Sequence, residues 1–102
     1  MIYGLMGKIR AHEGNGEKSL AQLLRAPEEL SELEDYYMYV VGRDNADVDA
    51  VWVTEIWRSQ DDHQASLTHE AIRTLIASAR PLIAEMTNRT EFEPVGGKGL
   101  SD

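Results

Sequence analysis

Two neighbouring segments of this sequence carry apolar side chains at both alternating positions, and this feature limits the folds open to the chain more than any other. Residues 35–42 (DYYMYVVG) and 50–57 (AVWVTEIW) are rich in aromatic and β-branched residues, which favour strands. The polar turn at residues 43–47 joins them as a hairpin. Because side chains in a strand alternate between the two faces of a sheet, both faces of this hairpin are largely apolar. A sheet with one face in water would instead alternate apolar and polar residues.

The first third of the chain predicts a strand followed by a helical region. Residues 2–11 are mostly apolar and predict a strand, which ends before a glycine-rich turn at residues 14–16. Residues 17–26 place leucines at helical spacing. Pro27 lacks an amide hydrogen, so we expect a kink there, followed by a short second helix through Leu33.

The last third predicts a divided helical region and a final strand. Residues 61–67 predict a short helix, and Thr68 is expected to cap a longer helix with apolar residues at i, i+3, i+4 and i+7. Pro81 is expected to end or kink that helix, and its apolar stripe continues beyond the proline. Residues 87–93 predict the last strand, and residues 94–102 form a glycine-rich tail.

The predicted order of elements is strand, helix, strand, strand, helix, strand, within a single domain of residues 1–102. This order is typical of an α+β, ferredoxin-like split βαβ fold, in which helices cover one face of a four-stranded antiparallel sheet. The second apolar face then exceeds the exposed patch that monomers normally tolerate. We expect the same face of a second copy to cover it, in a two-fold homodimer. The alternative is that loops and the tail of the same chain cover it.

Composition excludes several classes of function. The 102 residues include no cysteine, which rules out disulfides, thiolate metal sites and a cysteine nucleophile. The 10 basic and 18 acidic residues give a formal charge of −8, and no cluster of Lys and Arg favours nucleic acid. No apolar run approaches the ~20 residues of a membrane span, and residues 1–10 lack the pattern of a signal peptide. We therefore expect a cytoplasmic protein that binds neither membranes nor nucleic acid.

The second strand of the hairpin and the helix after it carry a motif of a known family. Residues 52–59 (WVTEIWRS) and 61–67 (DDHQASL) resemble the E-x-W-x-S … H-x-x-x-L segment of the antibiotic biosynthesis monooxygenase family. Residues 79–83 (ARPLI) and 94–97 (PVGG) are similar to segments that small bacterial members carry after it. The resemblance covers almost the whole chain. It implies a dimeric α+β barrel, made by two ferredoxin-like sheets that face each other.

The same resemblance carries expectations about function. Some members of this family oxygenate phenols, anthrones or quinols without a metal or flavin, and others related by fold degrade haem. It therefore implies a small aromatic substrate, dioxygen and no cofactor. Several members have His or Trp before the conserved leucine, where this chain has Ser66. The haem-degrading branch relies on such a Trp and on a His in the next helix, where this chain has Ala77 and Ser78, so haem degradation is disfavoured. A Gly-Cys pair common before the second strand is replaced by Asp35 and Tyr36.

His63 is the leading candidate for a catalytic base. It follows the hairpin on a short predicted helix, and the ordinary histidine pKa of about 6.5 suits proton transfer from a phenol. The alternative is an exposed helix histidine without a role. His12 and His69 are expected at the surface, and the three histidines lack the spacing of a metal site, so we expect no metal.

Glu55 is the second catalytic candidate, because it shares a strand face with Trp57. As a buried acid it would act as a base, or it would pair with Arg58 or Arg80.

Three further residues are candidates for substrate binding. Trp57 and Trp52 are expected to point to opposite faces of the sheet, and Trp57 to line a pocket or to belong to the core. Tyr39 would donate a hydrogen bond to a substrate oxygen or pack within the sheet. Arg80, beside the proline break, would stabilise a phenolate or lie as a cation at a helix C-terminus.

The resulting hypothesis is a homodimeric monooxygenase that oxidises a small phenol or quinol with dioxygen, in a pocket between the sheet and the helices. The expected enzyme uses no cofactor, and its reaction is inferred from family analogy. The alternative is a non-catalytic dimeric module that binds a small aromatic ligand or a protein partner. Ser66, in place of His or Trp, favours this alternative.

Overall fold

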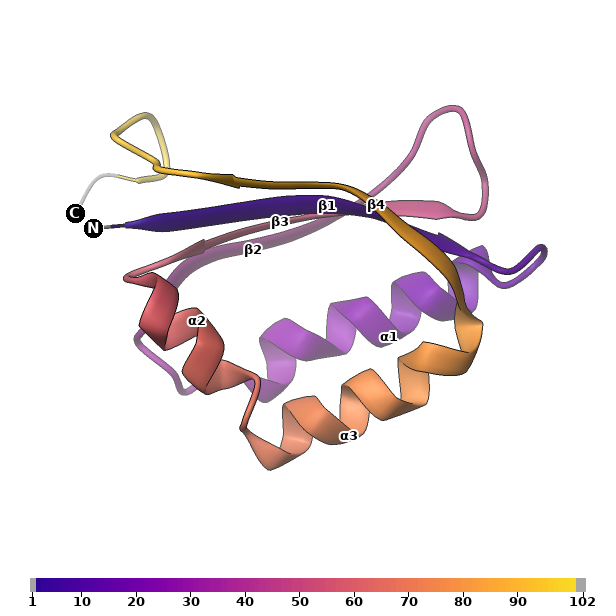
Figure 1. The fold of residues 1–102 in the computed structure, drawn as a ribbon, viewed down its shortest axis with the longest axis horizontal. Helices are drawn as coiled ribbons and strands as arrows, with labels where there is room; N and C mark the ends of the chain where they lie inside the picture. Colours follow the sequence, from indigo (N-terminus) through magenta and orange to yellow (C-terminus); the bar gives the residue numbers. More distant parts are fainter. Residues whose placement is uncertain (1, 101–102) are drawn as a thin grey trace.

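Within residues 2–100, which the computed structural model describes, three α-helices cover one face of a four-stranded antiparallel sheet (Figure 1). The predicted tail is therefore described to residue 100, and residues 101–102 lie outside the described part. The strand order is β2-β3-β1-β4, which confirms the predicted α+β, ferredoxin-like arrangement. The strands are β1 (Tyr3–Ala11), β2 (Tyr36–Arg43), β3 (Ala50–Trp57) and β4 (Ile83–Phe92). The helices are α1 (Gly16–Glu29), α2 (Gln60–Ser66), α3 (Glu70–Ala79) and the short 3-10 turn η1 (Arg80–Leu82).

The register of the central strands places large side chains under the helices. Trp57 at the end of β3 lies opposite Tyr3 on β1 and opposite Tyr36 on β2. Alternate side chains of β3 are buried against the helices, and Val51 and Trp57 are 2% and 1% exposed. Trp52 has the opposite parity and lies half-buried on the other face, as predicted.

The first helix, α1, is continuous, so the predicted kink and separate second helix are wrong. Pro27 lies in the last turn of α1, which runs to Glu29. At that position the missing proline N–H removes one hydrogen bond, and the chain leaves the helix soon afterwards. The N–H of Leu30 donates to the carbonyl of Ala26 at 2.9 Å, and both residues are buried in the core beside Trp57.

The short helix α2 begins within a residue of its predicted start. Ser59 Oγ accepts a hydrogen bond from the N–H of Asp62 at 3.1 Å, which caps the helix. The predicted cap of α3 is wrong, because His69 is the N-cap and Thr68 donates its hydroxyl to the carbonyl of Ala65 at 2.7 Å. Among residues 2–100, no helix is long and apolar enough to cross a membrane.

The last strand, β4, starts at Ile83 rather than at residue 87. Ile83 pairs with Ala11 of β1, so the apolar residues after the proline extend the strand and do not continue a helical stripe. The pairing between β4 and β1 is irregular next to Lys8, and Asn88 adopts a φ of 55°. This irregularity changes which side chains of β4 face the helices.

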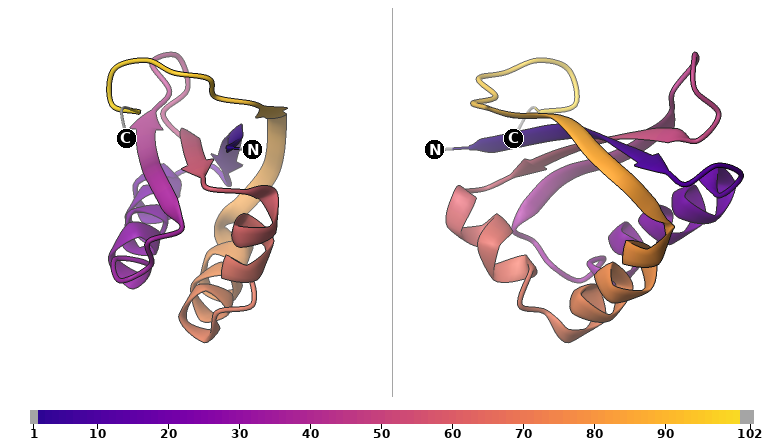
Figure 2. Two further views of the ribbon diagram at one scale, coloured as in Figure 1. Left: turned by 90° about the vertical axis from the view of Figure 1, so that its left-hand side faces the viewer. Right: turned by 45° about the vertical axis from the view of Figure 1, so that its right-hand side comes forward.

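The face of the sheet opposite the helices is only partly covered. Figure 2 shows that the segment after β4 curls over one end of this face. A Cβ atom added at Gly99 would lie 3.7 Å from Met38 Cε, so the tail contacts β2 there. Val40, also on β2, remains 52% exposed. Within the described chain, an apolar part of the sheet thus stays open to solvent.

Candidate active site

A cavity of about 480 Å³ lies between the sheet and the helices that cover it. This volume falls within the ~300–1,000 Å³ of small-molecule sites. Each of the other three strands and all three α-helices contribute two or more residues, whereas β2 contributes Tyr39 alone. Most of the lining is aliphatic or aromatic. Its polar or charged residues are Lys8, Gln22, Tyr39, Glu55, His63, Ser66, Thr87 and Arg89.

Three of the expected site residues meet at one carboxylate oxygen. The indole N–H of Trp57 donates a hydrogen bond to Glu55 Oε1 at 3.0 Å. His63 Nε2 lies 3.8 Å from the same Oε1 atom. The rings of Trp57 and His63 meet edge to face, with 5.6 Å between their centroids. The end of β3 and the first turn of α2 therefore build the arrangement, because Ser59 caps α2 directly after the strand.

Burial disfavours the charged forms of both titratable groups at this point. Burial raises the pKa of Glu55, while the hydrogen bond from Trp57 and the charge of Arg89 act in the opposite direction. Burial also lowers the pKa of His63, Arg89 lowers it further, and Glu91 acts against them. The imidazole therefore favours its neutral form, in which one ring nitrogen is a proton acceptor. The neighbouring carboxylate would stabilise the imidazolium that forms.

Two tyrosines complete the polar surroundings. Tyr39 lies opposite Glu55 in the β2–β3 register, and burial, with the charge of Glu55, raises its pKa well above the ordinary value. It therefore stays protonated and can donate a hydrogen bond. The hydroxyl of Tyr3 donates to Glu91 Oε2 at 2.7 Å, and its ring centroid lies 5.5 Å from that of His63. Tyr3 thus lies between the imidazole of His63 and the carboxylate of Glu91 on β4.

The structure places the expected arginines elsewhere. Arg80 is exposed in η1 and is not among the residues that line the cavity. Arg58 pairs with Asp62 at 2.8 Å and with Asp35 at 3.3 Å, so neither arginine contacts Glu55. Arg89 of β4 lines the cavity instead. Sequence reasoning missed Arg89, because the irregular pairing of β4 decides where this side chain points.

Gln22 of α1 is a second residue that sequence reasoning missed. Among the described residues, two buried side-chain atoms lack a hydrogen-bond partner, Gln22 Oε1 and His63 Nδ1. Both residues line the cavity. Ser66 differs from them, because its hydroxyl donates to the carbonyl of His63 at 2.6 Å. The helical spacing of residues 17–26 indicated a buried face but gave no sign that Gln22 belongs to it.

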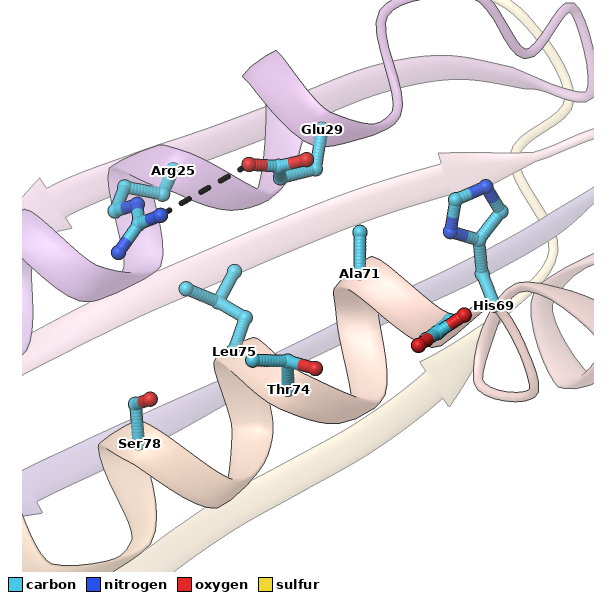
Figure 3. A pocket seen from close by; sticks show the side chains of 8 residues that line it. Arg25, Glu29, His69, Ala71, Thr74, Leu75 and Ser78 are labelled. Atoms are coloured by element: carbon cyan, nitrogen blue, oxygen red, sulfur yellow. Dashed lines mark ion pairs between the residues drawn. The ribbon is translucent and has the colours of Figure 1, made fainter.

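A second depression, of about 470 Å³, lies between α1 and α3 (Figure 3). Arg25 and Glu29, one turn apart on α1, form an ion pair at 3.9 Å on one side of it, and His69 lies at the start of α3. The rest of its lining comes from α3 and consists of Glu70 and four small or aliphatic side chains, Ala71, Thr74, Leu75 and Ser78. Among residues 2–100, no three His, Asp or Glu side chains come together to hold a metal ion. The cavity with Glu55 and His63 is therefore the stronger candidate site.

Comparison with known sequences identifies one family. The model of the antibiotic biosynthesis monooxygenase family matches residues 2–78. No curated protein sequence matches the chain.

Solved structures share the whole architecture. A protein of Chloroflexus aurantiacus J-10-fl, assigned to the antibiotic biosynthesis monooxygenases, is 40% identical, covers 99% of this chain and 100% of its own, and has a TM-score of 0.90. A Nitrosomonas europaea protein with the same assignment is 10% identical, covers 92% and 90%, and has a TM-score of 0.84. A variant of SnoaB, a cofactor-independent oxygenase of Streptomyces nogalater, is 10% identical, covers 95% and 96%, and has a TM-score of 0.79. The last two show the likeness of the fold.

Proposed function

The chain belongs to the antibiotic biosynthesis monooxygenase family, and from this premise we propose that it oxygenates a small phenol or quinol with dioxygen inside the cavity, without a metal or organic cofactor. The family and its structural neighbours support a monooxygenase-like function. The observation that carries the proposal is the contact of His63 with Glu55 within a largely apolar cavity. SnoaB, which shares the fold, is a cofactor-independent oxygenase.

The proposed reaction converts a phenol and dioxygen into a quinone and water. His63 takes the phenolic proton, and the phenolate gives one electron to dioxygen. The two radicals join in a carbon–oxygen bond at a hydrogen-bearing ring carbon ortho or para to the phenolate oxygen, and the peroxide takes the proton back from His63. Loss of the ring hydrogen as a proton then breaks the oxygen–oxygen bond and leaves a carbonyl. The released hydroxide combines with that proton as water, so the substrate supplies all the electrons.

The side chains around His63 have distinct roles in this proposal. Glu55 orients the imidazole and stabilises its protonated form, because its Oε1 atom lies 3.8 Å from Nε2. Trp57 fixes Glu55 through the indole N–H and forms one wall. Tyr39 offers a hydrogen-bond donor to a substrate oxygen. Arg89 supplies positive charge at the cavity, the role that the sequence had given to Arg80.

Oxygen uptake with a panel of phenols and quinols tests the proposal. We expect wild-type uptake, and a decrease in kcat/KM of about 10²–10⁴-fold in His63→Gln, because a general base is lost. His69→Gln changes an exposed histidine outside the cavity and should retain full activity. Equal activity of His63→Gln and wild type would refute the assignment of the base. A Soret band after addition of haem would favour a haem-binding protein instead.

A second candidate is a non-catalytic module that binds a small aromatic ligand. The observation in its favour is that the Ser66 hydroxyl is held by the carbonyl of His63 and is not offered to a ligand. Binding of phenols without any oxygen uptake would support this candidate over the oxygenase.

We further propose that the chain acts as a homodimer through the open face of its sheet. Val40, 52% exposed, and the half-buried Met38 and Trp52 lie there, and only one end is covered by the tail. A second copy presenting the same face would bury this apolar surface.

A further inference from the structure

The cavity is larger than one aromatic ring requires. On β1, Leu5 pairs with Glu55 of β3 and Ile9 pairs with Met86 of β4, and all four residues line the cavity. Because Leu5 and Ile9 are four residues apart on one strand, the cavity extends for about 13 Å along β1. Its volume of about 480 Å³ is about three times the ~150 Å³ in which an apolar protein cavity holds benzene. A single phenol ring therefore leaves more than half of the cavity unfilled.

The two ends of the cavity differ in chemistry. Glu55 and His63 lie at the end beside Leu5, where the proposed reaction takes place. Ile9, Ala79 and Met86 line the other end, and the first two are each 8% exposed. Lys8 is next to Ile9, but its Nζ atom lies 3.6 Å from Asp44 Oδ2, which also accepts from Trp52 on the opposite face of the sheet. The end beside Ile9 is therefore suited to a hydrocarbon group.

The cavity opens to solvent between β4 and the helices α2 and α3. Its exposed lining residues all belong to this side, and they are Leu67, Ile76, Met86, Thr87 and Arg89. Leu67 and Ile76 are each 39% exposed, and Met86 is 69% exposed. Large apolar side chains gathered around the opening of a pocket indicate that a ligand covers them. A rigid fused-ring compound within the cavity would leave them in water, whereas a flexible chain that leaves through the opening would cover them.

We propose that the substrate is a phenol or quinol with a flexible hydrocarbon chain, which lies along Ile9 and Ala79 and leaves the cavity between Ile76 and Met86. This inference rests on the proposed function, because it places the ring of the substrate beside His63. It adds the chemical class of the substituent. Ile76 and Met86 are then specificity-determining residues that contact the chain and not the ring.

The test uses hydroquinones that differ in their substituent. The probes are hydroquinone, propylhydroquinone, pentylhydroquinone and the fused-ring compound naphthohydroquinone. Their dissociation constants are measured by NMR titration in oxygen-free buffer, so that no turnover occurs. The proteins are wild type, Ile76→Gln, Met86→Gln and the matched control Leu24→Gln. Leu24 is also an exposed apolar residue on a helix, 46% exposed, but it does not line the cavity.

We expect the dissociation constant of wild type to decrease by about threefold to fourfold for each chain carbon that becomes buried. In Ile76→Gln and in Met86→Gln, the preference for pentylhydroquinone over hydroquinone should decrease by about threefold to tenfold, because a polar side chain replaces an apolar contact. Leu24→Gln should keep the wild-type preference. Each preference is a ratio of two constants of the same protein, so a change that affects both probes equally cancels.

A second measurement needs no variant. In wild type, pentylhydroquinone should shift the methyl signal of Met86, whereas hydroquinone should not. The methyl signal of Met38, on the open face of the sheet, should stay in place with both probes. A shift of Met38 instead of Met86 would place the chain on that face and overturn the inference.

The remaining outcomes separate this inference from the proposed function. If hydroquinone binds but the chain adds no affinity, or if both rim variants keep the wild-type preference, no chain occupies the opening and the proposed function stands. Tighter binding of naphthohydroquinone than of pentylhydroquinone would show that a fused ring fills the cavity instead. If Ile76→Gln or Met86→Gln converts a dimer into monomers in light scattering, a second copy covers the opening. If no probe binds wild type, the proposed function fails, and this inference fails with it.

Discussion

At the residue scale, the Trp57 indole fixes the carboxylate on which the proposed chemistry depends. Trp57→Phe removes the N–H that donates to Glu55 and leaves a gap in the core. We expect the free energy of unfolding to fall by about 2–3 kcal/mol, from the lost volume and the unpartnered oxygen. The pKa of Glu55 should rise further, because the hydrogen bond from Trp57 lowers it.

Urea denaturation measures this loss, and Trp52→Phe is the matched control. Trp52 donates to Asp44 Oδ2 at 2.8 Å, but on the other face of the sheet, where it is half-buried. Trp52→Phe should therefore lower the free energy of unfolding by less than Trp57→Phe does. It should also leave ligand binding in the cavity unchanged. Equal losses in the free energy of unfolding would show that Trp57 contributes no more to stability than Trp52 does.

His63 also makes stability depend on pH. Burial lowers its pKa below the unfolded value of 6.5, so below about pH 6.5 the unfolded chain binds a proton more readily than the folded one. The contribution of His63 to the free energy of unfolding is therefore fully present above this pH and is lost as the pH falls. Glu55 has a raised pKa, so its contribution has the opposite sign and is lost as pH rises.

We expect His63→Gln to flatten the decrease in stability between about pH 6.5 and pH 5, measured by urea denaturation at each pH. The exposed control His69→Gln should leave the decrease in place. A wild-type slope retained in His63→Gln would mean that other groups cause the pH dependence.

At the scale of elements, Gly16 joins the start of α1 to the β2–β3 turn. A Cβ atom there would meet the backbone of Val48 and would lie 2.8 Å from Asp49 Cα. The N–H of Gly16 also donates to Asp49 Oδ1 at 3.1 Å. Gly16→Ala should therefore cost about 2–3 kcal/mol in thermal or urea denaturation, because backbone must move. At Gly42 a Cβ atom meets nothing within 4 Å, so Gly42→Ala should change stability by less than about 1 kcal/mol.

The hydrophobic pattern predicted correctly those elements whose residues fit only one kind of secondary structure. β2 and β3 followed from their own aromatic and β-branched residues. The start of β4 did not, because Leu82, Ile83 and Met86 fit both a helical stripe and a strand, and the pairing of Ile83 with Ala11 decides the matter. Taken alone, Pro27 predicts a break in the helix. The sequence does not show that α1 ends only two residues later, because that end depends on the packing of Leu30 in the core.

At the scale of the whole molecule, the part of the site predicted from sequence is the part that is local in sequence. Glu55, Trp57 and His63 lie within one strand end and the helix turn after it, so a motif can place them together. Gln22 and Arg89 come from α1 and β4, and only the assembled fold brings them to the same cavity. Arg80 was expected because it stands beside a proline, but η1 leaves it exposed.

The proposed homodimer belongs to this scale and can be separated from the cavity. Light scattering at micromolar concentration should give a mass near twice the 11.4 kDa of one chain. Val40→Glu puts a charge on the open sheet face and should give monomers, whereas Val48→Glu, at an 89% exposed position in the β2–β3 turn, should not. The residues of one chain already enclose a cavity of about 480 Å³, so we expect a monomeric Val40→Glu still to bind phenols. Loss of binding together with the dimer would show that the second copy holds the cavity in shape, and a wild-type mass near 11.4 kDa would refute the dimer.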